Sequence, residues 1–147
     1  AMLDRCRAAL PAQAAITLVC DSLQNVAINN ASVVVLNFTL QFVPLPERDA
    51  VIKAIYDGLM PGGALVLSEK ICFENSVMQT LMTELHHDFK KANGYSDLEV
   101  SQKRSALENV LMPETLAAHE ARLQKAGFTN TGVWFQCFNF MSLVAIK

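Results

Sequence analysis

The chain has 147 residues, of which 52% are hydrophobic, and a formal net charge of −2 from 12 basic and 14 acidic side chains. This size predicts a single domain. The near-neutral net charge gives no indication of a basic surface that would bind a polyanion, so we expect no direct binding to nucleic acid. No apolar run approaches the roughly 20 residues of a membrane-spanning helix, and the first ten residues lack a signal-peptide core. We therefore expect a cytoplasmic protein with no membrane partner.

Helical spacing of apolar residues predicts a helix over residues 1–9, and since this helix has no cap we expect the sequence to begin in mid-domain. A short strand is expected over 16–20. Val33 to Leu36 form an apolar run that predicts a strand buried on both faces. Asn37 follows at its carboxyl end, where open α/β sheets bind their ligands.

A helix is predicted over 47–60, with an apolar stripe on one side and charged residues, Arg48 among them, outside it. The Pro-Gly-Gly sequence at 61–63 ends this helix, and a buried strand follows over 64–69. Glu69, at the end of that strand, is a candidate for the rim of a pocket. Strand, helix and strand make a βαβ unit, which we expect to cross over with the right hand.

Further helices are predicted over 74–93, 96–111 and 112–126. The last two predicted strands, 132–138 and 141–146, are close enough to form an antiparallel hairpin. Four aromatic residues in this hairpin are expected to fill the faces of the sheet, because a platform for nucleic-acid bases would need basic residues between them. They are Trp134, Phe135, Phe138 and Phe140.

No metal site is expected. The four cysteines show no C-x-x-C pair, so neither a zinc site nor a disulfide framework is indicated, and buried, reduced thiols are expected. They are Cys6, Cys20, Cys72 and Cys137. His86 and His87 point about 100° apart on a helix and do not readily share one ion, which favours a packing or interface role.

The order of elements resembles the second half of a class I S-adenosyl-L-methionine-dependent methyltransferase. The amino-acid sequences of five segments are more specific, and they resemble those of the carboxy-S-adenosyl-L-methionine synthase family. These segments are VLNFTLQF (35–42), GALVLSEK (63–70), HHDFKKANGYS (86–96), SQKRS (101–105) and WFQCFNF (134–140). The resemblance implies an α/β fold, with a Rossmann-like, mostly parallel sheet that ends in an antiparallel hairpin.

The resemblance also implies an activity. Family members combine S-adenosyl-L-methionine with prephenate to give carboxy-S-adenosyl-L-methionine and phenylpyruvate, and a separate enzyme uses the product to modify the wobble uridine of tRNA. A homodimer is implied as well. Family members carry about a hundred residues before the position of Ala1, with the first strand and a glycine-rich turn, as one domain of this class requires. We therefore expect no catalysis from this portion alone.

The resemblance assigns site residues. Arg104 matches the arginine that binds the carboxylate of carboxy-S-adenosyl-L-methionine, and a guanidinium suits that role. Asn37 matches a cofactor residue at a strand end. Asp21, Ser22 and Leu23 lie where the family places an aspartate near the adenine, and the alignment leaves open whether Asp21 or Ser22 has its role.

Two alternatives remain open. One is an ordinary S-adenosyl-L-methionine-dependent methyltransferase, in which the transferred group is a methyl. The other is a non-catalytic fragment that folds or dimerises and binds no small molecule. We also leave open whether Arg104 acts within its own subunit or across a dimer.

Overall fold

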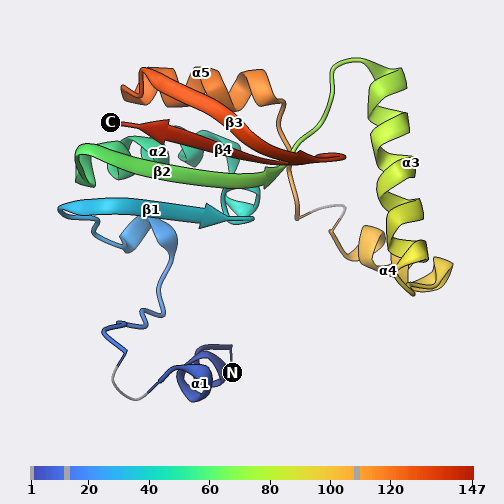
Figure 1. The fold of residues 1–147 in the computed structure, drawn as a ribbon, viewed down its shortest axis with the longest axis horizontal. Helices are drawn as coiled ribbons and strands as arrows, with labels where there is room; N and C mark the ends of the chain where they lie inside the picture. Colours follow the sequence, from blue (N-terminus) through green and yellow to red (C-terminus); the bar gives the residue numbers. More distant parts are fainter. Residues whose placement is uncertain (1, 12–13, 108–109) are drawn as a thin grey trace.

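The computed structural model describes residues 2–11, 14–107 and 110–147 (Figure 1). Its elements follow the predicted order, with a strand or helix at every predicted position except 16–20. They are α1 (Met2–Ala9), η1 (Leu23–Asn25), β1 (Ala31–Asn37), η2 (Leu40–Phe42), α2 (Leu45–Gly58), β2 (Leu59–Lys70), α3 (Ser76–Ala92), α4 (Asp97–Leu107), α5 (Leu116–Ala126), β3 (Asn130–Cys137) and β4 (Phe140–Ile146). The predicted start at residue 1, and residues 108 and 109 of the helix predicted over 96–111, lie outside the described residues.

The sheet has the order β1-β2-β4-β3. β1 and β2 pair in parallel across α2, which confirms the predicted βαβ order, and β4 pairs antiparallel with both β2 and β3. The hairpin of β3 and β4 is therefore confirmed. Within the described chain, one strand pair is parallel and two are antiparallel, so parallel pairing is confined to the β1 side of the sheet.

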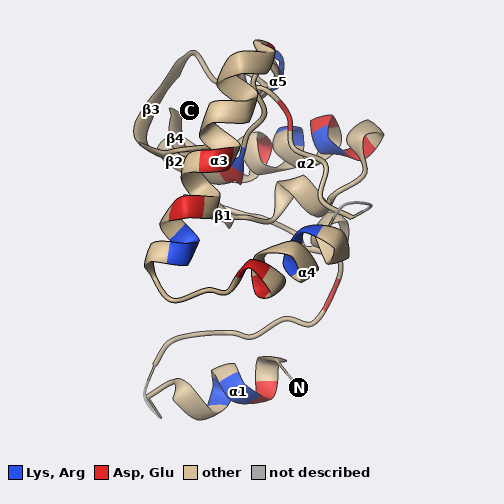
Figure 2. Ribbon diagram, turned by 90° about the vertical axis from the view of Figure 1, so that its right-hand side faces the viewer, with Lys and Arg blue, Asp and Glu red and all other residues tan. Residues whose placement is uncertain are grey.

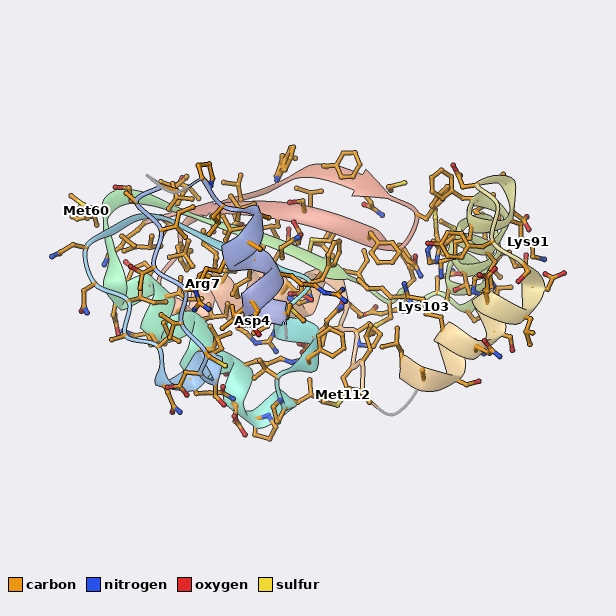
Figure 3. All side chains as sticks on the ribbon, turned by 90° about the horizontal axis from the view of Figure 1, so that it is seen from below. Asp4, Arg7, Met60, Lys91, Lys103 and Met112 are labelled. Carbon is orange, nitrogen blue, oxygen red and sulfur yellow. The ribbon has the colours of Figure 1, made fainter. Side chains whose placement is uncertain are left out.

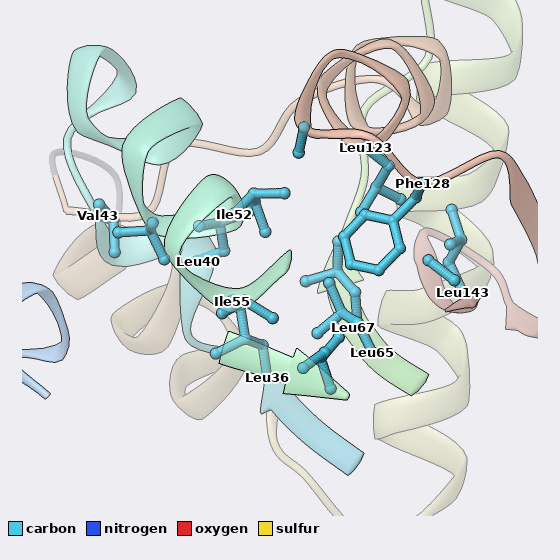
Figure 4. Close-up of a cluster of buried hydrophobic side chains, with 14 of the residues drawn as sticks. Leu36, Leu40, Val43, Ile52, Ile55, Leu65, Leu67, Leu123, Phe128 and Leu143 are labelled. Atoms are coloured by element: carbon cyan, nitrogen blue, oxygen red, sulfur yellow. The ribbon is translucent and has the colours of Figure 1, made fainter. Parts of the chain in front are cut away.

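The hydrophobic core lies between one face of this sheet and the two helices α2 and α5 (Figures 1 and 4). Strand residues alternate between the faces, so that Leu36, Leu65 and Leu67 point toward the helices from neighbouring strands. From α2, Ile52 and Ile55 fill the same layer and are fully buried. Each large aliphatic side chain buried in this way stabilises the fold by roughly 1.5–3 kcal/mol.

The opposite face of the sheet is largely uncovered by the described residues. Val33 and Val35 are 58% and 60% exposed, so the prediction that this strand is buried on both faces is wrong. The physical reason is that no described helix packs on that side, and β1 is also an edge strand. Trp134 and Phe135 are likewise more than half exposed, against the expectation that the hairpin aromatics fill the sheet faces.

Three further predictions are wrong. Residues 16–20 form no strand, since no described strand pairs with them, and Ile16 and Val19 are more than half exposed. Cys6 and Cys20 are exposed, and Cys72 and Cys137 are half-buried, so the free thiols are not core residues. Arg48 is fully buried, although we placed it outside the apolar stripe of its helix.

The helix pair α3 and α4 lies beyond the carboxyl ends of β1 and β2, at the right of the sheet in Figure 1. The side chain of Asn75 caps α3 by accepting the backbone N–H of Met78 at 3.1 Å. α4 has acidic residues in its first turn and Arg104 in its last, an order that complements the helix dipole and is visible in Figure 2. None of the described helices is both long and apolar enough to cross a bilayer.

Candidate functional site

A cavity of about 590 Å³ lies between the carboxyl end of the sheet and the α3–α4 pair. This is the edge at which open α/β sheets bind ligands. Its walls come from η2 and the residues that flank it, from the end of β2 and the start of β4, from α3 and α4, and from the segment at 111–113. Six separate parts of the chain therefore converge on one space of a size suited to a small molecule.

The loop from β1 to η2 forms one wall, and its backbone is held in an uncommon conformation. Phe38 has a φ of 53°, which few bulky residues adopt, and its N–H donates to the carbonyl of Ser68 at 2.8 Å. Its ring packs edge to face against Phe140, with the ring centroids 5.7 Å apart. Backbone strain of this kind persists only where the surroundings fix it, and it gathers at functional sites.

Glu69 fixes the same loop from inside the protein. Its carboxylate is fully buried and accepts the backbone N–H groups of Thr39, Leu40 and Gln41 at 3.2, 2.8 and 3.1 Å. Burial raises the pKa of this carboxyl group to about 6, and the three N–H groups oppose that shift. Glu69 is absent from the cavity lining, so its place is beneath the loop and the prediction of a rim position is wrong.

Arg48 stabilises a second part of the cavity wall, the segment at 111–113. It forms an ion pair with Glu114 and donates to the carbonyls of Val43 at 2.9 Å and Met112 at 2.9 Å. The segment at 111–113, which supplies Leu111 and Pro113 to the cavity, is thereby tied to α2. A buried guanidinium needs several acceptors, and Arg48 has them.

Cationic side chains dominate the polar part of the cavity. Lys70 comes from the end of β2, Lys90 from α3, and Lys103 and Arg104 from α4. Figure 3 shows Lys103 in the space between the sheet and α4, whereas Lys91 lies on the outer side of α3. No carboxylate is among the described residues that line the cavity.

Burial and this cluster of cations lower the pKa values of titratable groups in the cavity. The pKa of Lys70 is lowered by burial and by the nearby Lys90 and Arg104. The pKa of His86 falls to about 4, chiefly because of burial, with Lys90 and Lys70 adding to the effect. His86 is therefore neutral at pH 7, and the cavity as a whole favours an anion.

The predicted site residues divide into two groups. Arg104 lines the cavity, together with His86 and His87, for which we expected a packing or interface role. Asn37 ends β1, with its side chain exposed beside the cavity rather than in its lining, while the next residue, Phe38, is part of the wall. Asn37 pairs with Ser68 and Ser68 with Ser142, so these three polar residues form a row across the sheet on the face opposite α2 and α5. Lys70 follows Ser68 by two residues on β2 and lies on the same face.

Asp21, Ser22 and Leu23 lie at the start of η1 and do not reach the cavity lining. The carboxylate of Asp21 accepts the side-chain amide of Asn25 at 2.8 Å and the backbone N–H of Ser22 at 2.7 Å. These two hydrogen bonds, the first more than the second, lower the pKa of Asp21. Leu23 packs against the hydrophobic core.

Sequence reasoning missed Lys70 and Lys90. Lys70 had a readable signal, because it directly follows a buried strand and so falls on the ligand edge of the sheet. Lys90 had none, since its direction depends on how α3 is set against the sheet. Among the described residues, no group of three or more histidine, cysteine, aspartate or glutamate side chains is arranged to hold a metal ion.

Several solved structures with a similar fold are named as methyltransferases. Human N-acetylserotonin methyltransferase, solved with S-adenosyl-methionine, superposes with a TM-score of 0.58 at 15% identity, over 86% of this chain and 32% of that protein. An O-methyltransferase family protein from Burkholderia thailandensis gives a TM-score of 0.59 at 18% identity, over 86% and 33%. At such identities the likeness shows the fold alone, which is that of the class I methyltransferases.

Sequence comparison is more specific, although no protein-family model matches. A protein of Shewanella denitrificans named carboxy-S-adenosyl-L-methionine synthase is 60% identical over 149 residues, covering 99% of this chain and 61% of the relative. One of the same name from Trichlorobacter lovleyi is 62% identical over 151 residues, covering 100% and 62%. The chain thus spans about three fifths of the curated relatives that it matches. Over its whole length, the chain is similar to a C-terminal portion of proteins named carboxy-S-adenosyl-L-methionine synthase.

Proposed function

We propose that this chain is the C-terminal part of an enzyme that makes carboxy-S-adenosyl-L-methionine from S-adenosyl-L-methionine and prephenate. The observation that carries the proposal is the 60–62% identity, over nearly the whole chain, to relatives of that name. The cationic cavity at the ligand edge of the sheet supports it independently, because both prephenate and the new product bear carboxylates. Arg104, in the lining of that cavity, is the proposed carboxylate ligand.

The proposed reaction balances without an external oxidant. Prephenate loses its ring carboxylate as carbon dioxide and its ring hydroxyl as hydroxide, and the ring becomes aromatic in phenylpyruvate. The sulfonium methyl group loses a proton, and its carbon forms a new bond to the carbon dioxide. The hydroxide and the proton give water. The protein must hold a dianion beside a sulfonium, a task suited to a cationic cavity with fixed walls.

The cofactor roles remain part of the proposal. Asn37 would contact S-adenosyl-L-methionine from the carboxyl end of β1, and Asp21, Ser22 and Leu23 would contribute near the adenine. Asn37 and Ser68 lie on neighbouring strands on the sheet face opposite α2 and α5, which supports a polar ligand there. We further propose a homodimer in the cytoplasm whose product serves the modification of the tRNA wobble uridine.

A chimera tests the function. Residues 1–147 would be joined to the N-terminal portion of the Shewanella denitrificans relative that has no counterpart in this chain, and products would be identified by mass spectrometry. The expected product is S-adenosyl-L-methionine heavier by one carbon dioxide, formed only when prephenate is added. Recovery of S-adenosyl-homocysteine with a methylated acceptor would instead support an ordinary methyltransferase and sink the proposal.

Arg104 has its own test in the chimera. Arg104→Met should lower the rate of product formation by about two orders of magnitude, since a bidentate charged contact to the carboxylate is lost. Arg5→Met, which removes an exposed arginine from α1, is the matched control and should leave the rate unchanged. Equal rates in the Arg104 and Arg5 variants would remove Arg104 from the site.

A further inference from the structure

The four cations of the cavity come from three elements. Lys103 and Arg104 are neighbours near the end of α4, whereas Lys70 ends β2 and Lys90 lies in the last turn of α3. Within the described part of the chain, none of the four forms an ion pair, although six other basic side chains do. The cavity therefore holds positive charge that the described protein does not neutralise.

Holding these charges together is unfavourable without an anion. Lys70 and Lys90 both have pKa values below the usual one, because burial disfavours their charged form and neighbouring cations repel it. For Lys70 those neighbours are Lys90 on α3 and Arg104 on α4, so it lies near cations of both helices. An anion that enters the cavity relieves this repulsion at more than one point.

The rest of the lining is apolar and partly aromatic. Phe38, Phe42 and Phe140 come from the sheet side, and Leu107 and Leu111 from the segment that includes the end of α4. Aromatic and aliphatic walls suit a six-membered ring, and the volume of about 590 Å³ accommodates one with two acidic substituents. The cavity thus combines a place for a ring with cations on several sides of it.

We propose that Lys70 and Lys90 form a second carboxylate subsite, distinct from that of Arg104, which binds the side-chain carboxylate that prephenate keeps when it becomes phenylpyruvate. The identity of this ligand rests on the proposed function, and the two-subsite arrangement rests on the cavity. Arg104 then holds the carboxylate that is transferred, and the two lysines hold the one that is not. The ring between the two groups lies against the aromatic wall.

This division predicts that the lysine variants and the Arg104 variant affect two ligands differently. Prephenate has both carboxylates, whereas phenylpyruvate has only the side-chain one. Isothermal titration calorimetry of the 147-residue chain should show that Lys70→Met and Lys90→Met each weaken both ligands by about tenfold, the loss of one charged contact. Arg104→Met should weaken prephenate by a similar factor and change the affinity for phenylpyruvate by less than about twofold.

Two further variants separate charge from structure. Lys91 is adjacent to Lys90 but points away from the cavity and pairs with Asp97 at 2.6 Å, so Lys91→Met should leave both affinities unchanged. Lys70→Arg keeps the cation and should retain affinity within about threefold, whereas a merely structural role for Lys70 would not respond to charge. Thermal melting of every variant checks that it is folded.

Several results would overturn the inference. They are the absence of saturable prephenate binding, lysine variants that affect prephenate but not phenylpyruvate, and lysine and Arg104 variants that act alike on both ligands. The binding experiment needs no turnover, so its outcome is separate from the product assay of the chimera. A chimera that forms no carboxylated product, beside the expected binding pattern, would reject the proposed function and leave a site for ring-bearing dicarboxylates.

Discussion

The backbone N–H of Leu40 donates a 2.8 Å hydrogen bond to the buried carboxylate of Glu69, 29 residues further along the chain. Thr39 and Gln41 donate to the same group, so one side chain from β2 fixes the whole entry to η2. This loop carries three lining residues, Phe38, Gln41 and Phe42. The geometry of the cavity therefore depends on a residue that the cavity does not contain.

Glu69 should make stability depend on pH in an unusual direction. Its pKa is raised from 4.5 to about 6 in the folded state, so its contribution to stability is fully present below 4.5 and is lost as the pH rises through 6. In urea unfolding, the advantage of the native protein over Glu69→Gln should therefore grow by up to about 2 kcal/mol between pH 7.5 and pH 4.5. A difference that stays constant over this range would contradict the account.

His119 should produce the opposite dependence. It is 2% exposed, its ring nitrogens have no hydrogen-bond partner among the described residues, and burial is the main cause that lowers its pKa to about 4. Its contribution is present above pH 6.5 and is lost as the pH falls toward 4, by up to roughly 3 kcal/mol. His119→Leu should remove this loss. Urea unfolding at pH 7.5 and 5 measures it, and an unchanged acid sensitivity would refute it.

The buried Arg48 should be among the costliest residues to replace. Arg48→Met leaves Glu114 with only its 2.6 Å pair to Arg122 and strips the carbonyls of Val43 and Met112 of their donor. The expected loss of unfolding free energy is about 3–5 kcal/mol, as for other broken buried pairs. Lys53→Met removes an exposed pair with Asp57 and should cost no more than about 0.5 kcal/mol. Similar losses in the two variants would disprove the buried network.

Gly127 and Gly132 form a matched pair of glycines. At Gly127 the φ is 120° and a β-carbon would lie 2.6 Å from the ring of Tyr56, so Gly127→Ala should destabilise the fold by about 2 kcal/mol or more. A β-carbon added at Gly132 would meet no atom within 4 Å outside the glycine and its two chain neighbours, and no left-handed φ is required there. Gly132→Ala should therefore change stability by less than about 1 kcal/mol. Thermal unfolding of both variants tests the contrast, and a Gly127→Ala protein as stable as the native one would contradict it.

The predicted elements were right in type and order where their signal is local, as for the apolar stripe of α2. One boundary was wrong: α2 ends at Gly58 and β2 begins at Leu59, so the Pro-Gly-Gly sequence at 61–63, which we expected to separate helix from strand, lies inside β2. Burial was harder to predict, because it depends on partners elsewhere. Val33 looks like a core residue in its own segment and is exposed for lack of a covering element, whereas Arg48 looks like a surface residue and is buried by acceptors from distant loops.

The site shows the same division. Arg104 was found through the resemblance of a short segment, and the structure places it in the cavity. Lys90 and His86 join it only because of the angle at which α3 stands to the sheet, which no pattern in the sequence specifies. The convergence of these elements required three-dimensional information.

The outer edge of β1 is open to pairing with another strand. This edge offers unpaired backbone N–H and C=O groups, no described strand covers it, and Val33 and Val35 beside it are exposed. Such an edge is a template for strand addition. Any preparation of these 147 residues should therefore self-associate increasingly with concentration, and solubilising charges on this strand would suppress the aggregates without disturbing the helix-covered side.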